Sequence, residues 1–460
     1  MSPWVARNLL FPLHERLLGK RTRLFLRELE ASQFWPIEKL RELQMRKLAA
    51  LVAYAQSKVP YFGRLFAEHG IRATAIQDFD DFHRIPLMTK QTIREHLEEL
   101  MPTGYRGRIV PVATGGSTGE PLQLYNDMVR IARCDAARHR VYRWYGVNIG
   151  DREVALWGSP ADLSKMDRLR LVRDRLMNTR LLRAFGLDEP TMDRYIDVFR
   201  SYRPRKVYAY VSCAYVMALH MLHTKARLPE PPAVMIVTAE PLYDFQRKAI
   251  EEAFQTRVSV EYGCRDGGLI AGQCPSGGIH LNAELNYVEL GPAGTQRTPD
   301  GAGEVVVTNL DAHVVPIIRY RTGDLAIAGK TKCPCGRELP TLHAIQGRST
   351  DFLVAPDGKL VHALAVIYAV RTVPGVEQFR IHQTGPTHID VQLQASSAFD
   401  QSAIEQIRRN MARVFDGQVQ VDISLVGRID PGPSGKFRYV TSSVRSPLLN
   451  PQTAASSPKS

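Results

Sequence analysis

The stretch that decides the fold is residues 233–266, AVMIVTAEPLYDFQRKAIEEAFQTRVSVEYGCRD. Ala233–Val237 is an apolar run with the length of a buried strand. Asp244 is predicted to cap a helix that continues to about Phe254. Val258–Glu261 reads as the next strand. The stretch therefore predicts a strand–helix–strand unit, which is typical of a mostly parallel sheet with helices packed on it.

The same alternation continues on both sides of this unit. Strands are predicted upstream at Glu153–Trp157 and Lys206–Val211, and downstream at Gly303–Leu310 and Val314–Ile318. Residues 1–100 read as helical, because apolar residues recur there at three- and four-residue spacing before a stop at Pro60; they are Leu40, Leu43, Leu48, Leu51, Val52 and Ala55. These elements predict a large α/β domain over 1–347 with parallel-rich sheets and a helical N-terminal segment.

The character of the chain changes after Gly347. Apolar residues alternate around Val391 and again around Val421, and Ser402 with Glu405 forms a capping box for a helix between them. This order predicts a small α+β domain over 348–445. The last residues, 446–460, are rich in Ser, Pro and Ala and are predicted to be a disordered tail.

Composition excludes several classes of protein. With 460 residues and 44% hydrophobic residues, the chain is too apolar to be mainly disordered and too long for one core. No apolar run reaches the roughly 18 residues of a membrane span. The first residues, MSPWVARNLLFPLHER, carry charges and no small-residue cleavage site, so they are not a signal peptide. We therefore expect a cytoplasmic protein.

The chain is basic, with 60 Lys and Arg against 47 Asp and Glu, a net charge of +13. Such a surplus suits nucleic acid, a membrane surface or an anionic small substrate. Residues 164–183, SKMDRLRLVRDRLMNTRLLR, are the densest basic stretch and predict an amphipathic helix. Its basic face is either simply solvated or in peripheral contact with an anionic membrane or another polyanion. No zinc-finger or RNA-binding signature is present, so we expect no nucleic-acid partner.

Five segments carry residues suited to a nucleotide: ATGGSTGEP at 113–121, TAEPL at 238–242 with EYGCRD at 261–266, RYRTGD at 319–324, GRSTD at 347–351 and PGPSGKFR at 431–438. Glycines let backbone N–H groups approach phosphate oxygens, and loops after parallel strands are ligand sites. A carboxylate at Asp266 suits Mg²⁺ on a phosphate, and a lysine at Lys436 can stabilise developing negative charge. Taken singly, each segment has an ordinary alternative: a flexible turn at 113–121, a helix cap at Asp266, a surface turn at 319–324, an interdomain salt bridge at 347–351 and a solvated loop lysine at Lys436.

In this order, the five segments resemble the adenylate-forming superfamily of acyl-CoA synthetases and related ligases. Within it the chain is similar to the phenylacetate–CoA ligase group, and more so to the capsular-polysaccharide-biosynthesis-like branch. The similarity extends over roughly residues 35–440 and includes the helical N-terminus that ends in Val59-Pro-Tyr-Phe62.

The resemblance implies a role for each matching residue. Thr114, Gly116, Ser117, Thr118 and Gly119 would grip the ATP phosphates. The adenine site would be formed by Ala239, Glu240, Pro241 and Tyr262, and the ribose would be held by Asp324 and Arg348. Asp266 stands where the family has a Mg²⁺-binding Glu, Asp351 would be the hinge, and Lys436 would be the catalytic lysine of a mobile C-terminal domain. Tyr208, Tyr210 and Tyr215 occupy the region of the acyl pocket.

The implied chemistry has two steps. A small carboxylic acid attacks the α-phosphate of ATP, giving acyl-AMP and pyrophosphate, and the acyl group then passes to an acceptor. Coenzyme A is the first expectation for the acceptor. The stretch 352–361 differs from that of phenylacetate–CoA ligases, so an amine or hydroxyl acceptor stays open. A non-catalytic nucleotide-binding protein is the remaining alternative.

Three of the six cysteines suggest a metal site. Cys274 precedes His280, and Cys333 and Cys335 form a C-P-C pair further along the chain. A Cys₃His set is a common structural zinc site, and its four protein ligands leave no open position for catalysis. Part of the resembling group carries zinc at similar positions. The alternatives are two turns with incidental thiols, or a ligand role for Cys264.

Overall fold

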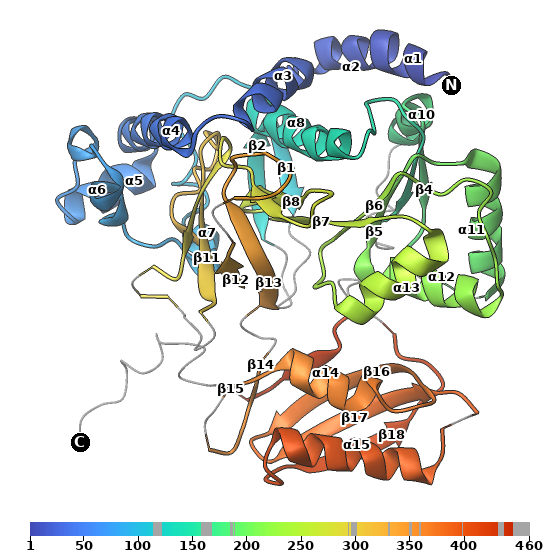
Figure 1. The fold of residues 1–460 in the computed structure, drawn as a ribbon. Helices are drawn as coiled ribbons and strands as arrows, with labels where there is room; N and C mark the ends of the chain where they lie inside the picture. The colour runs from blue at the N-terminus through green and yellow to red at the C-terminus, as the bar shows by residue number, and fades with distance from the viewer. Residues whose placement is uncertain are drawn as a thin grey trace, which may run out of the picture. The chain divides into compact units, whose positions relative to one another are not determined.

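The computed structural model describes residues 1–113, 122–157, 168–184, 187, 189–292, 294–295, 301–329, 332–348, 352–357, 360–397, 399–430 and 437–444. The chain forms two compact units (Figure 1). The large unit comprises 1–290, 304–322 and 326–346, and the small unit comprises 291–303, 323–325 and 347–460. The large unit is α/β and the small unit is α+β, which confirms the predicted fold class. The predicted tail, 446–460, lies outside the described residues.

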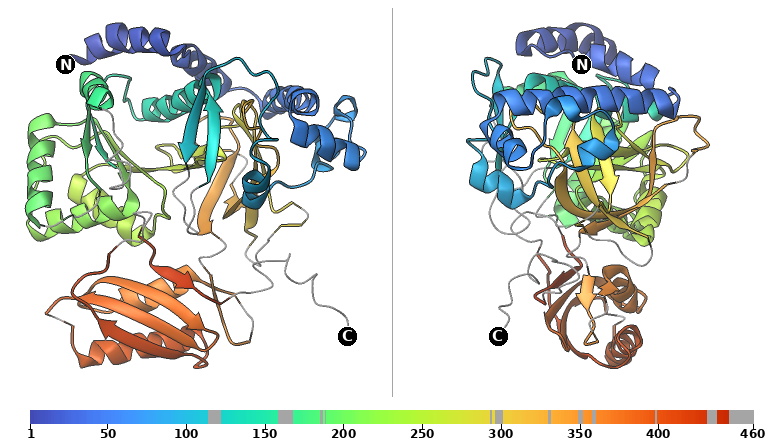
Figure 2. Two further views of the ribbon diagram at one scale, coloured as in Figure 1. Left: turned by 180° about the vertical axis from the view of Figure 1, so that it is seen from behind. Right: turned by 90° about the vertical axis from the view of Figure 1, so that its left-hand side faces the viewer.

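Helices form most of the first hundred residues, as the spacing of apolar residues predicts. They are α1 Pro3–Val5, a π-helical turn η1 Ala6–Leu10, α2 Phe11–Leu18, α3 Thr22–Ser32, α4 Ile37–Lys58, α5 Pro60–Glu68, a 3₁₀ turn η2 Ala73–Ala75, α6 Phe79–His83 and α7 Lys90–His96. Pro60 begins α5 instead of only ending α4, because proline lacks an N–H and suits the first helical position. Both views in Figure 2 place α1 to α3 on the outside of the large unit.

Eleven strands of the described chain form one sheet in the order β10-β11-β12-β13-β9-β8-β7-β6-β5-β3-β4. The parallel half consists of β3 Glu153–Leu156, β4 Thr179–Leu182, β5 Lys206–Tyr210, β6 Val234–Thr238 and β7 Val258–Cys264. These strands pair in parallel throughout. Their crossovers include α10 Arg168–Leu176, α11 Glu189–Tyr202, α12 Val211–His223 and α13 Asp244–Phe254.

The other half of the sheet is largely antiparallel. It consists of β8 Gly268–Gln273, β9 Ile279–Leu281, β10 Asn286–Leu290, β11 Gly303–Asn309, β12 Tyr320–Ala328 and β13 Thr341–Arg348. Antiparallel pairs join β7 to β8, β8 to β9, β9 to β13 and β10 to β11. The sheet is therefore mixed, whereas the strand–helix–strand unit alone predicted a mostly parallel one. A separate antiparallel pair is formed by β1 Ile109–Ala113 and β2 Gln123–Asp127.

Some predicted elements of the large unit are wrong. Val314–Ile318 is buried but is no strand, because Pro316 cannot donate to a ladder. The predicted helix over 164–183 ends at Leu176 within the described residues, and Thr179–Leu182 instead joins the sheet beside β3. Asn178, with φ of +62°, makes the turn between them. Asp244 is the first residue of α13, and Tyr243 holds the cap position.

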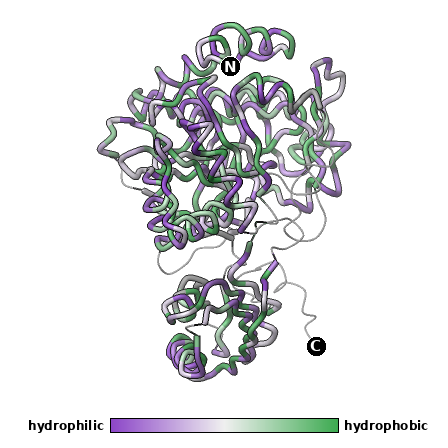
Figure 3. Tube along the Cα trace, turned by 90° about the vertical axis from the view of Figure 1, so that its right-hand side faces the viewer, coloured by the Kyte–Doolittle hydropathy of each residue, from purple (hydrophilic) through white to green (hydrophobic). Residues whose placement is uncertain are grey.

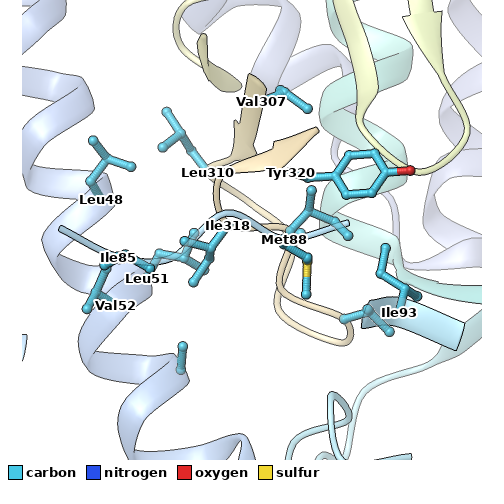
Figure 4. Packing of buried hydrophobic residues seen from close by; sticks show 14 of the residues in the cluster. Leu48, Leu51, Val52, Ile85, Met88, Ile93, Val307, Leu310, Ile318 and Tyr320 are labelled. Atoms are coloured by element: carbon cyan, nitrogen blue, oxygen red, sulfur yellow. The ribbon is translucent and has the colours of Figure 1, made fainter. Parts of the chain in front are cut away.

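The main core joins the N-terminal helices to the sheet. Figure 4 shows Leu48, Leu51 and Val52 of α4 near Ile318, with Val307 and Tyr320 contributed by β11 and β12. Helix α8 (Met128–Trp144) packs its alanines against α3 and β8 in a second cluster, which contains Phe25, Leu26, Leu29, Ala132, Ala136, Ala137 and Leu269. No helix in the described part of the chain is long and apolar enough to cross a membrane.

The small unit has its own sheet, in which the described strands order as β18-β17-β16-β19. They are β16 Val376–Gly385, β17 His388–Ala395, β18 Gln420–Leu425 and β19 Val440–Ser442, accompanied by the pair β14 Phe352–Val354 and β15 Leu360–His362 and by the helices α14 Ala363–Arg371 and α15 Gln401–Val414. Helix α15 buries Ala403, Ile407 and Met411 on one face. Its cap is Asp400, which accepts a hydrogen bond from the Ala403 N–H, and the predicted capping box at Ser402 is wrong.

Candidate functional site

The carboxyl edge of the parallel half brings three predicted segments together. Tyr210, Thr238 and Glu261 are in register across β5, β6 and β7. Ala239–Pro241 leaves β6 directly after this row, and Tyr262 directly follows Glu261. Because the carboxyl ends of parallel strands meet at one edge, the residues predicted for the adenine lie side by side there.

The loop after β6 is fixed by its own side chains. Ala239 has φ of +71°, a left-handed conformation that a non-glycine residue rarely adopts. The Glu240 carboxylate accepts a hydrogen bond of 2.6 Å from the Ser212 N–H and one of 2.9 Å from the Ser212 hydroxyl. Ser212 lies at the start of α12, where the helix dipole favours a negative charge. Glu240 therefore anchors the loop to the helix N-terminus.

Asp266 lies in the tight turn between β7 and β8 and is buried. Its carboxylate accepts hydrogen bonds from the Tyr320 hydroxyl and the Gly267 N–H. The Arg130 guanidinium donates to the Asp266 backbone carbonyl over 2.6 Å. Tyr320 and Arg130 are distant in sequence, and no local pattern pointed to them. They fix both the side chain and the backbone of the predicted Mg²⁺-binding residue.

A partly buried ionic cluster and two aromatic rings border the same edge. Arg138 forms an ion pair of 3.0 Å with Glu261, which also accepts a 2.8 Å hydrogen bond from the Tyr208 hydroxyl. Burial opposes the charged form of Arg138, but the charge of Glu261 raises the Arg138 pKa. Trp157 stacks on Tyr210 with ring centroids 4.1 Å apart. These aromatic rings lie where the resemblance implies an acyl pocket.

The remaining predicted nucleotide residues are placed only in part. Asp324 is half-buried on β12, and Arg348 is the last residue of β13. The phosphate-loop residues Thr114, Gly116, Ser117, Thr118 and Gly119, the hinge Asp351 and the lysine Lys436 lie outside the described residues. Their assigned roles stay predictions.

The structure brings together all four predicted metal ligands in the antiparallel half. The ligand atoms of Cys274, His280, Cys333 and Cys335 all lie within 4.8 Å of one another. The Cys274 and Cys333 sulfurs are 3.7 Å apart, and the Cys335 sulfur is 3.2 Å from His280 Nε2. Zn–S bonds of about 2.3 Å in a tetrahedron put two sulfurs about 3.8 Å apart. The cluster therefore has the dimensions of a zinc site.

The surroundings of the cluster also suit a metal. His280 Nδ1 donates to the Leu339 carbonyl over 3.2 Å, which leaves the Nε2 lone pair facing the thiols. Burial lowers the pKa of His280 to about 4, so its imidazole is neutral and can act as a ligand. A Cβ on Gly278 would lie 2.7 Å from the Cys333 sulfur, so only glycine fits there. Cys264 lies at the end of β7 and is not among the four.

Known proteins resemble both the small unit and the chain as a whole. Residues 353–443 match the family model of the CapK C-terminal domain. Over 96% of its length the chain is 21% identical to Protein CapK of Staphylococcus aureus, covering 98% of that protein. It is 26% identical to a phenylacetate-coenzyme A ligase of Thermus thermophilus, over 69% of this chain and 72% of that one.

Solved structures agree on the fold. A 2-hydroxyisobutyryl-CoA ligase in its postadenylation state, bound to an acyl adenylate, aligns with a TM-score of 0.72 and 19% identity over 92% of this chain and 94% of that one. An O-succinylbenzoate coenzyme A synthetase of Bacillus subtilis in complex with AMP aligns with a TM-score of 0.51 and 14% identity, over 71% of this chain and 67% of that one. Residues 353–443 thus belong to the CapK C-terminal domain family, and the whole chain is similar in sequence to CapK and to phenylacetate-coenzyme A ligases and shares the fold of the 2-hydroxyisobutyryl-CoA ligase.

Proposed function

We propose that the protein is an AMP-forming ligase that activates a small carboxylic acid with ATP. One carboxylate oxygen attacks the α-phosphorus, the bond to the β-phosphate oxygen breaks, and pyrophosphate leaves. The observation that carries the proposal is the edge where Ala239–Pro241 and Tyr262 lie beside the buried Asp266 turn. The similarity to phenylacetate-coenzyme A ligases over 69% of the chain supports it.

The chain's own residues contribute binding and charge. Tyr262 and the loop anchored by Glu240 would hold the adenine, and Asp324 with Arg348 would hold the ribose. Asp266, oriented by Tyr320, would offer one oxygen to Mg²⁺, which supplies positive charge on the phosphates when bound. Lys436 would offset the repulsion between the attacking carboxylate and the α-phosphate.

We propose coenzyme A as the acceptor of the activated acyl group. The thiol releases its proton to solvent as its sulfur attacks the acyl carbon, the bond from that carbon to the AMP oxygen breaks, and AMP leaves with the oxygen that came from the acid, so that a thioester forms. The support is the similarity to a phenylacetate-coenzyme A ligase in sequence and to a 2-hydroxyisobutyryl-CoA ligase in fold. The stretch 352–361 differs from that of phenylacetate–CoA ligases, which keeps an amine or hydroxyl acceptor as the second candidate.

Carboxylate-dependent exchange of pyrophosphate into ATP tests the first step. We expect exchange with at least one acid of a panel of aryl and short-chain acids. Lys436→Ala should lower the rate by about a hundredfold or more, the usual cost of removing a charge-stabilising group. The matched control is Lys248→Ala on the exposed side of α13, which should retain the full rate. ATP binding without exchange for any acid would contradict the proposal and favour a non-catalytic nucleotide-binding protein.

The acceptor is tested with the acid that supports exchange. Coenzyme A should convert the acyl-AMP to a thioester, detected by its mass. An acyl amide or ester formed instead from an amine or a hydroxyl compound would select the second candidate.

We also propose that the Cys₃His cluster binds a structural zinc ion. The support is the fit of the four ligand atoms, the neutral His280 and the room left by Gly278. Four protein ligands fill a tetrahedron, so the ion would join the β8–β9 turn to the loop before β13 and take no part in catalysis. Metal analysis should give one zinc per chain, and a zinc-free folded protein would refute the site.

A further inference from the structure

The N-terminal helices carry an apolar ridge that no described part of the molecule covers. Trp4, Leu9, Leu13 and Leu17 are 63%, 55%, 54% and 74% exposed. Large apolar side chains scattered singly on a surface are ordinary, but four within fourteen residues of helix are not. Figure 3 shows hydrophobic and hydrophilic residues alternating along this segment.

The helix geometry puts the four side chains in one line. Leu9, Leu13 and Leu17 are four residues apart and share a helix face. Trp4 precedes Leu9 by five residues, but the turn between them is π-helical, with the Phe11 N–H bonded to the Ala6 carbonyl. One π turn takes up the extra residue and brings Trp4 onto the same line.

The opposite face of this segment is firmly attached to the large unit, so the ridge cannot simply turn inward. Ala6 is fully buried, and Gly150 packs so closely that a Cβ there would lie 2.9 Å from the Arg7 N atom. Arg7 donates to the Ile149 carbonyl over 2.9 Å and pairs with Asp151 over 2.9 Å. Phe11 contacts His139 edge to face.

Positive charge surrounds the ridge. Residues 1–27 contain six basic residues and one acidic residue, the buried Glu15, and two of the six, Arg7 and Lys20, pair with Asp151 and Asp135. Arg16 and Arg21 are exposed beside the ridge. Helix α10 lies close to α2, because Arg173 and Asp174 both act electrostatically on His14, and it adds exposed Arg175, Val172 and Leu176.

We propose that this ridge, Trp4, Leu9, Leu13 and Leu17 with its basic border, docks the protein on an anionic membrane surface. An amphipathic helix with Trp and Leu on one side and Arg around it lies in the plane of the headgroups, where the apolar side chains enter the acyl boundary and the cations meet anionic lipid. The charge complementarity favours lipid over a second copy of this chain, because two identical basic borders would repel. The inference does not depend on the proposed ligase activity.

Vesicle sedimentation with the full chain tests the proposal. The protein should sediment with phosphatidylcholine vesicles that contain phosphatidylglycerol, and much less with phosphatidylcholine alone or at high salt. The double variant Leu13→Glu with Leu17→Glu should bind the anionic vesicles at least about tenfold more weakly. Leu425→Glu is the matched control, since Leu425 is 59% exposed on β18 of the small unit, and it should bind like the wild type.

Trp4 provides a second readout. Its fluorescence should shift to the blue on binding anionic vesicles, and Trp4→Phe should lose that shift while still sedimenting. Equal binding of the double variant and the wild type would overturn the proposal. So would light scattering that shows a dimer which the double variant dissociates, with no vesicle binding by either protein.

Discussion

The two halves of the large sheet use their loops differently. In the parallel half, β5, β6 and β7 end at one edge, so Ala239–Pro241 and Tyr262 meet there although they come from separate strands. In the antiparallel half, most neighbouring strands follow one another in the chain, and the Cys₃His cluster links the β8–β9 turn to the connection between β12 and β13. Under the proposed assignments, the parallel half would supply a binding edge and the antiparallel half would be cross-linked by zinc.

The largest effect should come from opening the cross-link. Cys333→Ser should lose the zinc and lower the free energy of unfolding by about 3 kcal/mol or more, since metal binding to such a set is strongly coupled to folding. Metal analysis and denaturant unfolding measure the two effects. The matched control, Cys264→Ser, should keep both the zinc and the stability. Zinc lost from Cys264→Ser and kept in Cys333→Ser would show that the ligands are wrongly assigned.

A change at the binding edge should lower activity and leave the zinc content unchanged. Asp266→Asn should slow pyrophosphate exchange about a hundredfold, or about 2.7 kcal/mol in the barrier, with the zinc content unchanged. Tyr320→Phe, which removes the hydrogen bond to Asp266 but keeps the carboxylate, should cost less than Asp266→Asn. Asp197→Asn on α11 is the exposed control. If Asp266→Asn lost stability but kept the full rate of exchange, the assignment of Asp266 to substrate binding would be wrong.

Acid should weaken the large unit through His139 on α8, the helix that packs against β8. Burial, and next the charge of Lys206, lower the pKa of His139 to about 3. The unfolded chain therefore takes up a proton below about pH 6.5, whereas the folded chain does not, and stability falls as the pH falls toward 3. This group alone should cost about 2 kcal/mol at about pH 5. Unfolding of His139→Gln should depend less on pH; an unchanged pH dependence would contradict the burial argument.

The smallest effect concerns the loop after β6. Glu240→Ala removes the acceptor for the Ser212 N–H and hydroxyl, and should cost about 1 kcal/mol of stability, as for other helix caps. It should also weaken ATP binding, because the loop would no longer be held to the N-terminus of α12. Calorimetry measures both the stability and the affinity for ATP. Unchanged ATP affinity in Glu240→Ala would show that the loop after β6 does not help to bind the adenine.

Local sequence predicted the elements that depend on local rules. The strand–helix–strand unit at 233–261 is confirmed because apolar runs and a helix of ordinary length need no distant partner. The strand predicted at Val314–Ile318 is wrong: the segment is apolar and buried, but Pro316 has no N–H to donate to a neighbouring strand. The cap of α15 fell on Asp400 because its carboxylate reaches the Ala403 N–H, as Ser402 cannot from inside the helix.

The candidate site was harder to predict where contacts are distant. The spacing of Cys274, His280, Cys333 and Cys335 suggested a set that the structure does bring together. By contrast, Arg130 and Tyr320 lie 136 and 54 residues from Asp266, and nothing local marks them as its partners. The π turn that aligns Trp4 with Leu9 was equally invisible, because the spacing of five residues breaks the usual helical pattern.

The central claim is that the protein joins a carboxylate to the α-phosphate of ATP, and tracing the carboxylate oxygen tests it most directly. The acid that supports the fastest exchange would be labelled with heavy oxygen in its carboxylate and incubated with ATP and acceptor. The account predicts that the label appears in AMP, because the attacking oxygen stays on phosphorus when the acyl group leaves. Label-free AMP, or label in inorganic phosphate with formation of ADP, would contradict it.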